Sequence, residues 1–169
     1  YIQEGETDTL SLKRSLDTGT EEQRLAVQRI IEELRKNGDE AVRSFTKQFD
    51  GVSIEQSLVT EDEKTKAYER LDPEMIQIIQ TAIRNIRTYH ERQLTSSWFY
   101  HQKDGSMLGQ KVTPLDAVGV YVPGGTAAYP SSVLMNVIPA LVAGVERIVL
   151  VTPPGKDGRL SDAVLVAAK

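Results

Sequence analysis

The chain has 169 residues, of which 40% are hydrophobic and 26% are charged, and its formal net charge is −4. This composition is that of an ordinary globular protein, and the length is typical of one domain or slightly more. The mild negative charge argues against a protein that binds nucleic acid through a clustered basic face. Because the chain has no cysteine, disulfides and thiolate chemistry are excluded.

The sequence predicts neither a membrane span nor a targeting segment. The nearest approach to a membrane span, residues 133–145, is interrupted by Asn136, Pro139 and Gly144 and falls short of the roughly 18–20 apolar residues that a span needs. The polar and acidic start, YIQEGETDT, is unlike a signal peptide. We therefore expect a cytoplasmic protein that binds neither membranes nor nucleic acid.

Helices dominate the first half of the chain. Thr20 and Gln23 form a capping box that opens the first helix, and Asn37-Gly38 ends it. Asp39 is then predicted to cap a second helix that ends at Asp50-Gly51. Apolar residues recur at steps of three and four in both segments, which predicts one apolar face on each helix. These faces comprise Val27, Ile30, Ile31 and Leu34 in the first helix and Val42, Phe45 and Phe49 in the second.

Two further helices follow, each with its own start signal. Thr60 and Glu63 form a second capping box, which opens a helix that runs to Leu71. Asp72 followed by Pro73 is an N-cap with proline at the first helical position, and it begins the longest helix of the chain. We assign residues 1–94 to a helical N-terminal region. The apolar stripe of the longest helix comprises Ile76, Ile79, Ile83, Ile86 and His90.

The pattern then changes to strands. The segments SWFYHQ and MLGQKV flank Asp104-Gly105, a dipeptide typical of hairpin turns, so residues 95–116 are predicted to form a β-hairpin. Residues 117–122 and 147–151 are short apolar runs of the kind that buried parallel strands show. A helix that starts near Pro130 and ends before Gly144 separates them. We interpret residues 117–169 as the first βαβ unit of a nucleotide-binding domain, truncated within the apolar helical pattern SDAVLVAAK.

The turn after the first parallel strand is the candidate binding element. Ligands of α/β sheets gather at the carboxyl ends of the strands, beside the starts of the following helices. Gly124 and Gly125 allow positive φ and a close approach of the backbone to a bound group. Ser131 and Ser132, at the predicted helix start, offer N–H groups and hydroxyls to an anion. Tyr121 ends the strand, where its ring could stack on a flat ligand.

Spacing alone leaves the function of this turn open. The dinucleotide fingerprint G-x-G-x-x-G is absent, and the second strand is followed by Thr152-Pro153-Pro154 rather than by an acidic residue that would hold a ribose. The turn could be purely structural, or it could belong to a non-catalytic module that binds an anion or a nucleotide. A third hypothesis is that the chain is a purely structural or oligomerisation element whose interface is the apolar stripe of the longest helix.

The order of the residues is more specific than their spacing. The segment VGVYVPGGTAAYPSSVLMNVIPA, which begins at Val118, resembles the N-terminal part of histidinol dehydrogenases. The segments NGDEAV and FTKQFD between Asn37 and Asp50, the segment that ends in Tyr89-His90, and LGQKVTPL at residues 108–115 also resemble that family. The resemblance covers essentially the whole chain and identifies it as an N-terminal fragment of such an enzyme.

The resemblance implies an activity, cofactors and a fold. Histidinol dehydrogenases are zinc enzymes, usually homodimers, that oxidise L-histidinol through an aldehyde to L-histidine and reduce two NAD+. Their α/β fold is similar to that of aldehyde dehydrogenases. It implies a helical N-terminal region and a β-hairpin, followed by the start of an incomplete Rossmann-like parallel sheet. By the family pattern Tyr121 contacts NAD, Pro123 lies beside it, and Ser131 lies near the substrate pocket.

The catalytic and metal-binding groups of the family lie further along than this sequence reaches. By resemblance these are a Glu-His pair for proton transfer and the Gln, His, Asp and His ligands of zinc. The two histidines present, His90 and His101, lack metal-ligand spacing. We expect His90 to pack in the core and His101 to have a surface or packing role. The acidic run at residues 61–63 is interpreted as the first turn of a helix. We expect the fragment alone to be inactive.

Overall fold

The computed structural model describes residues 20–124 and 128–169 of the chain. The described residues fall into two compact units, which divide between Val42 and Arg43. Six helices and four strands are present in the described residues. None of these helices is both long and apolar enough to cross a membrane.

The described part of the first unit is mainly α1 (Glu21–Asn37). The Thr20 hydroxyl oxygen accepts from the Gln23 N–H at 3.3 Å, and the Gln23 side chain accepts from the Thr20 N–H at 2.9 Å, so the predicted capping box is confirmed. Gly38 ends the helix with a φ of 52°, a conformation that favours glycine. No residue of α1 is buried: Val27 and Ile31 of its apolar face are exposed, and Ile30 and Leu34 are half-buried.

Helix α2 (Asp39–Phe49) ends at Asp50-Gly51 as predicted, but it departs from the sequence prediction at its start and in the residues that it buries. Asp39 is the first helical residue rather than the cap before it, because only Gly38 separates α2 from α1. Phe49, predicted on the buried face, is 62% exposed and stacks on Phe45 with ring centroids 5.8 Å apart. The residue that α2 buries is the small Ala41.

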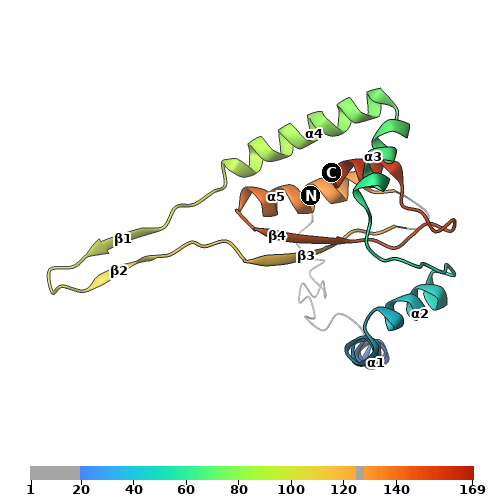
Figure 1. Ribbon diagram of the computed structural model, residues 1–169. Helices are drawn as coiled ribbons and strands as arrows, with labels where there is room; N and C mark the ends of the chain where they lie inside the picture. The colour runs from blue at the N-terminus through green and yellow to red at the C-terminus, as the bar shows by residue number, and fades with distance from the viewer. Residues whose placement is uncertain (1–19, 125–127) are drawn as a thin grey trace, which may run out of the picture. The chain divides into compact units, whose positions relative to one another are not determined.

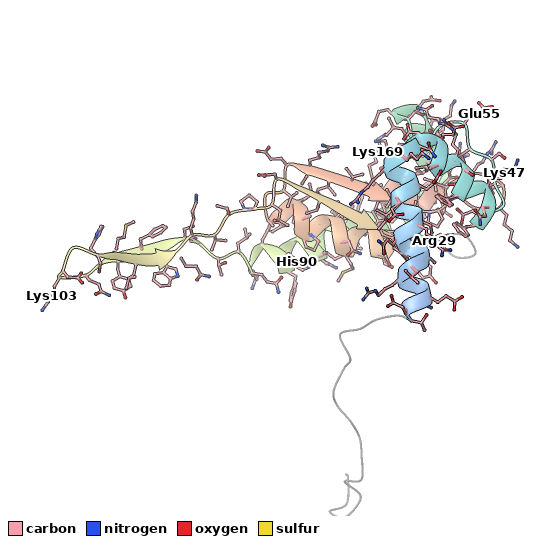
Figure 2. The ribbon with its side chains drawn as sticks, turned by 90° about the horizontal axis from the view of Figure 1, so that it is seen from below. Arg29, Lys47, Glu55, His90, Lys103 and Lys169 are labelled. Atoms are coloured by element: carbon pink, nitrogen blue, oxygen red, sulfur yellow. The ribbon has the colours of Figure 1, made fainter. Side chains whose placement is uncertain are left out.

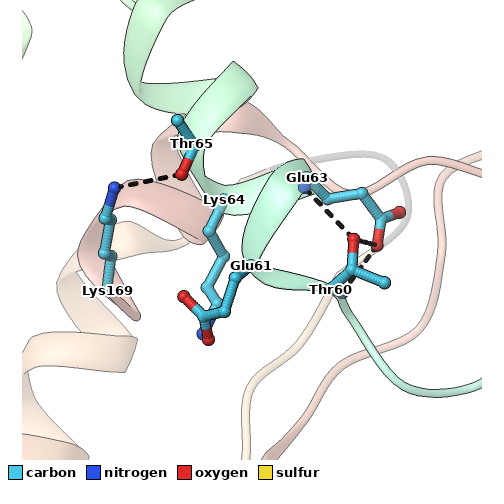
Figure 3. A network of polar contacts seen from close by, with 6 residues as sticks. All are labelled: Thr60, Glu61, Glu63, Lys64, Thr65 and Lys169. Atoms are coloured by element: carbon cyan, nitrogen blue, oxygen red, sulfur yellow. Dashed lines mark hydrogen bonds and ion pairs between the residues drawn. The ribbon is translucent and has the colours of Figure 1, made fainter.

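In the second unit, α3 (Glu61–Arg70) begins at the second capping box (Figure 3). The Thr60 hydroxyl accepts from the Glu63 N–H at 3.2 Å, while the Glu63 carboxylate accepts from the Thr60 N–H at 2.7 Å. These bonds from Thr60 lower the pKa of the Glu63 carboxyl. Glu61 pairs with Lys64, and Asp62 with Lys66, so the acidic run is the first turn of a helix, as predicted.

A helical layer covers one side of the parallel sheet. Helix α4 (Pro73–Glu91) lies along α5 (Pro130–Val142), and α3 packs against the short C-terminal helix α6 (Asp162–Ala167) (Figure 1). The Asp72 carboxylate accepts from the Glu74 N–H at 2.8 Å, which confirms the predicted N-cap of α4. One core cluster unites these helices through the buried residues Ala67, Ile79, Leu134, Ile138, Leu165 and Val166.

Strands β3 (Ala117–Tyr121) and β4 (Arg147–Val151) pair in parallel, with Tyr121 opposite Val151. With α5 between them they form the predicted βαβ unit, and a second core cluster joins Val120, Val122, Val133 and Val164. The strands are not buried on both faces as predicted. Val149 and Val151 are 44% and 53% exposed, because α5 and α6 cover one face only.

The hairpin consists of β1 (Trp98–His101) and β2 (Met107–Gln110), which pair antiparallel. Gly105 has a φ of 85°, and the Asp104 carboxylate accepts from both the N–H and the hydroxyl of Ser106. Lys103 lies at the far end of this arm, away from the helices (Figure 2). All strand residues of the hairpin are exposed, which leaves its aromatic side chains without a covering layer.

Candidate functional site

The candidate site lies at the carboxyl edge of the parallel sheet. Strand β3 ends at Tyr121 and β4 at Val151, and the N–H of the next residue, Val122, donates to the carbonyl oxygen of Val151 at 3.0 Å. Pairing therefore continues one residue past the end of β3. The segments that leave β3 and β4 start side by side, which is where α/β sheets bind their ligands.

The alternation of the strand decides which side chains this edge presents. Val120 is 8% exposed and Val122 is fully buried, both against the helical layer. Tyr121, between them, is 65% exposed, and Pro123, two residues after Tyr121, is exposed as well. Because successive residues of a strand point to opposite faces, both sequence-predicted cofactor residues lie on the uncovered face. The structure thus brings Tyr121 and Pro123 together on one surface.

Gly124 is needed at its position for a reason other than the one expected from the sequence. Its φ does not lie in the left-handed region. A Cβ atom at this position would lie 2.6 Å from the carbonyl oxygen of Pro153 and 2.8 Å from Oγ1 of Thr152. The close approach is therefore to the chain's own loop after β4. Gly125, the other glycine of the turn, lies outside the described residues.

The start of α5 is less open to an anion than the sequence suggested. Tyr129 is the N-cap and makes no side-chain capping bond, but its carbonyl oxygen accepts from the Ser132 N–H at 3.1 Å. The expectation of a free Ser132 N–H is therefore wrong: a tight first turn uses it internally. Ser131, the predicted substrate-side residue, is exposed in this first turn.

The two histidines lie away from this edge and form no metal centre. His90 is not a core residue as expected: it is half-buried in the last turn of α4, near one end of that helix (Figure 2). Its Nδ1 lies 2.6 Å from Oε1 of Gln93, and its ring stands nearly perpendicular to that of Tyr89, with centroids 5.3 Å apart. His101 is exposed on the hairpin. Within residues 20–124 and 128–169, no three His, Cys, Asp or Glu side chains gather closely enough to hold a metal ion.

Comparison with known proteins decides the family. A family model described as histidinol dehydrogenase matches residues 13–169 of the chain. The chain belongs to the histidinol dehydrogenase family. It is 71% identical over 161 residues to the histidinol dehydrogenase of Bacillus subtilis (strain 168), covering 95% of this chain and 38% of that protein. It is 58% identical over 159 residues to that of Geobacillus kaustophilus (strain HTA426), covering 94% of this chain and 38% of the relative.

A solved histidinol dehydrogenase structure supports the fold. The crystal structure of the enzyme from Elizabethkingia anophelis superposes with a TM-score of 0.82 at 32% sequence identity, covering 92% of this chain and 36% of that one. The predicted α/β class, with a helical region, a hairpin and a parallel sheet, is therefore confirmed. The chain spans 38% of the length of the two curated histidinol dehydrogenases.

Sequence reasoning missed one part of this edge, the pair Thr152 and Pro153. The sequence reading noted only that no acidic residue follows β4, and it did not connect these residues with Gly124. A glycine can mark a site where another backbone approaches closely, but the sequence does not show which segment approaches. The contact itself depends on which strands pair, and pairing is a tertiary property.

Proposed function

We propose that the chain is the N-terminal part of a histidinol dehydrogenase that oxidises L-histidinol, through the aldehyde, to L-histidine while reducing two NAD+. Family membership over residues 13–169 is the observation that carries the proposal. We extend it to a cytoplasmic, homodimeric enzyme of histidine biosynthesis that takes a small-molecule substrate. The chain by itself is proposed to be inactive. Oxidation of an alcohol in this way needs a base and a metal, and the described residues contain no cluster that could hold a metal ion.

Tyr121 and Pro123 suit a role in holding NAD. The Tyr121 ring is exposed, stands at the carboxyl edge of two parallel strands, and shares its face with Pro123. A flat ring in this place can stack on a flat heterocycle, and NAD when bound would supply the hydride acceptor. Ser131, exposed in the first turn of α5, is proposed to lie near the substrate.

The residues that the structure describes do not form a zinc site. No group of three possible ligands gathers in the described part of the chain, so zinc ligands would have to come from residues outside it. The alternative of a non-catalytic anion-binding module loses support from the start of α5. There the Ser132 N–H, which such a module would offer, already donates to Tyr129.

Replacing Tyr121 with alanine tests the cofactor role in full-length histidinol dehydrogenase that contains this sequence. Loss of a stacking contact of about 1.4 kcal/mol would raise the KM for NAD+ about tenfold, with the KM for histidinol little changed. Tyr89→Ala is the matched control, because Tyr89 is 63% exposed and lies on α4. An unchanged KM for NAD+ in the Tyr121 variant would exclude this residue from the cofactor site.

A further inference from the structure

We propose that Gly124 is a positioning residue for the cofactor site, because its missing Cβ lets the turn after β3 rest directly on Thr152 and Pro153 after β4. The inference depends on the proposed role of Tyr121 and Pro123 in binding NAD. It adds a second segment, the one that follows β4, to the structure that determines where those two residues lie.

The contact at Gly124 leaves no room for a side chain. A Cβ atom would meet the Pro153 carbonyl oxygen at 2.6 Å, Thr152 Oγ1 at 2.8 Å and Pro153 Cδ at 3.2 Å. Ordinary contacts of a Cβ atom begin at 3.4 Å, so an alanine would have to separate the two segments by about 0.8 Å. The nearest of the three atoms belongs to the backbone and cannot rotate away as a flexible side chain would.

The displacement caused by an alanine at position 124 would move the exposed side of the turn, because the other side is anchored. Val122 is fully buried and its N–H is bonded to the Val151 carbonyl oxygen, so the end of β3 is held in place. Pro123 lies between this anchored residue and Gly124, and its ring restricts φ. A shift at Gly124 is therefore transmitted to Pro123, on the face that carries the Tyr121 ring. Misplacing a binding group by about 1 Å is enough to change binding and rate strongly.

The glycine within the parallel sheet, Gly119, lacks this constraint. Gly119 lies in β3, two residues before Tyr121 and on the same uncovered face, and a Cβ atom there would meet nothing within 4 Å. Gly119→Ala is therefore a matched control: it makes the same substitution in the same strand, without the contact to the loop after β4.

The test compares variants of full-length histidinol dehydrogenase that contains this sequence. Gly124→Ala should raise the KM for NAD+ at least tenfold, while the KM for histidinol and the zinc content stay as in the parent enzyme. Gly119→Ala should leave all three unchanged. A second variant, Pro153→Ala, loosens the opposite side of the contact without adding an atom to the turn. It should raise the KM for NAD+ by a smaller factor, and it decides the question if Gly124→Ala does not fold.

Two results would overturn the inference. One is a folded Gly124→Ala enzyme, or a folded Pro153→Ala enzyme where that variant decides, whose KM for NAD+ matches that of the parent. The other is an equal rise in the KM values for both substrates, which would indicate general loosening of the site. Tyr121→Ala separates the two proposals. If Tyr121→Ala raises the KM for NAD+ and Gly124→Ala does not, only the positioning role fails. If Tyr121→Ala has no effect, the cofactor assignment fails as well.

Discussion

Replacing Leu134 with alanine should reveal how strongly α5 ties the helices of the second unit together. Leu134 is 3% exposed and belongs to the cluster that contains Ile79 of α4 and Leu165 of α6. Truncation to alanine removes buried methyl groups and leaves a cavity between three helices. For a leucine buried to this extent the loss is about 3 kcal/mol in the free energy of unfolding.

Leu141 offers a matched comparison in the same helix. It is 47% exposed, so Leu141→Ala removes about half as much buried surface and leaves no closed cavity. We expect a loss of about 1 kcal/mol. Because both variants make the same change of residue type within α5, differences in helix propensity cancel to first order. The expected difference between them is therefore about 2 kcal/mol.

Urea unfolding followed by far-UV circular dichroism measures this difference directly. Fluorescence is unsuitable, because the single tryptophan, Trp98, lies on the exposed hairpin and does not report on the helical core. In thermal unfolding, about 3 kcal/mol corresponds to a decrease in Tm of about 6–12 °C for a chain of this size. Equal losses for Leu134→Ala and Leu141→Ala would refute the reasoning, since they would show that Leu134 is not held between α4 and α6.

Two further predictions concern an ion pair and the hairpin. Arg70 donates from Nε and Nη2 to the two carboxylate oxygens of Asp162, at 3.0 and 2.5 Å, and these bonds lower the pKa of Asp162. A lowered folded-state pKa stabilises the fold above the unfolded pKa of about 3.9, and this contribution is lost as the pH falls through the folded value. The stability difference between the wild type and Asp162→Asn should therefore be constant near neutral pH and shrink below about pH 4. A difference that grows on acidification would contradict the assignment. In the hairpin, a Cβ atom at Gly109 would lie 2.2 Å from the Trp98 carbonyl oxygen and 2.4 Å from Cδ1 of Phe99, so Gly109→Ala should separate β1 from β2. The near-UV dichroism of the stacked Trp98–Tyr100 pair should then be lost while the helical signal remains; retention of the near-UV signal would show that the strands tolerate the added atom.

Much of the local structure could be predicted from the sequence, because it depends on contacts between residues close together in the chain. The capping boxes at Thr20 and Thr60 need only a hydroxyl and a side chain three residues later, and both formed as predicted. The N-cap at Asp72 and the hairpin turn at Gly105 are local in the same sense. The family, too, was evident from residue order alone, and the match over residues 13–169 confirms it.

The predictions that failed depend on which elements meet in space. His90 continues an apolar stripe in the sequence, but at the end of α4 no neighbouring element buries it, and it bonds to Gln93 instead. The apolar β4 strand reads as buried on both faces, yet α5 and α6 cover only one, which leaves Val151 exposed beside Tyr121. In the same way, a glycine in a turn suggests freedom in φ, but the reason for Gly124 is the backbone of Pro153.

The sequence by itself therefore determined most of the secondary structure and the family, since hydrogen bonds and residue order within short segments carry that information. Only the tertiary structure decided which face of the sheet is open, that Tyr121 and Pro123 share it, and that Gly124 lies against Thr152 and Pro153. Those properties arise from the parallel pairing of β3 with β4, which brings together residues about thirty positions apart in the chain.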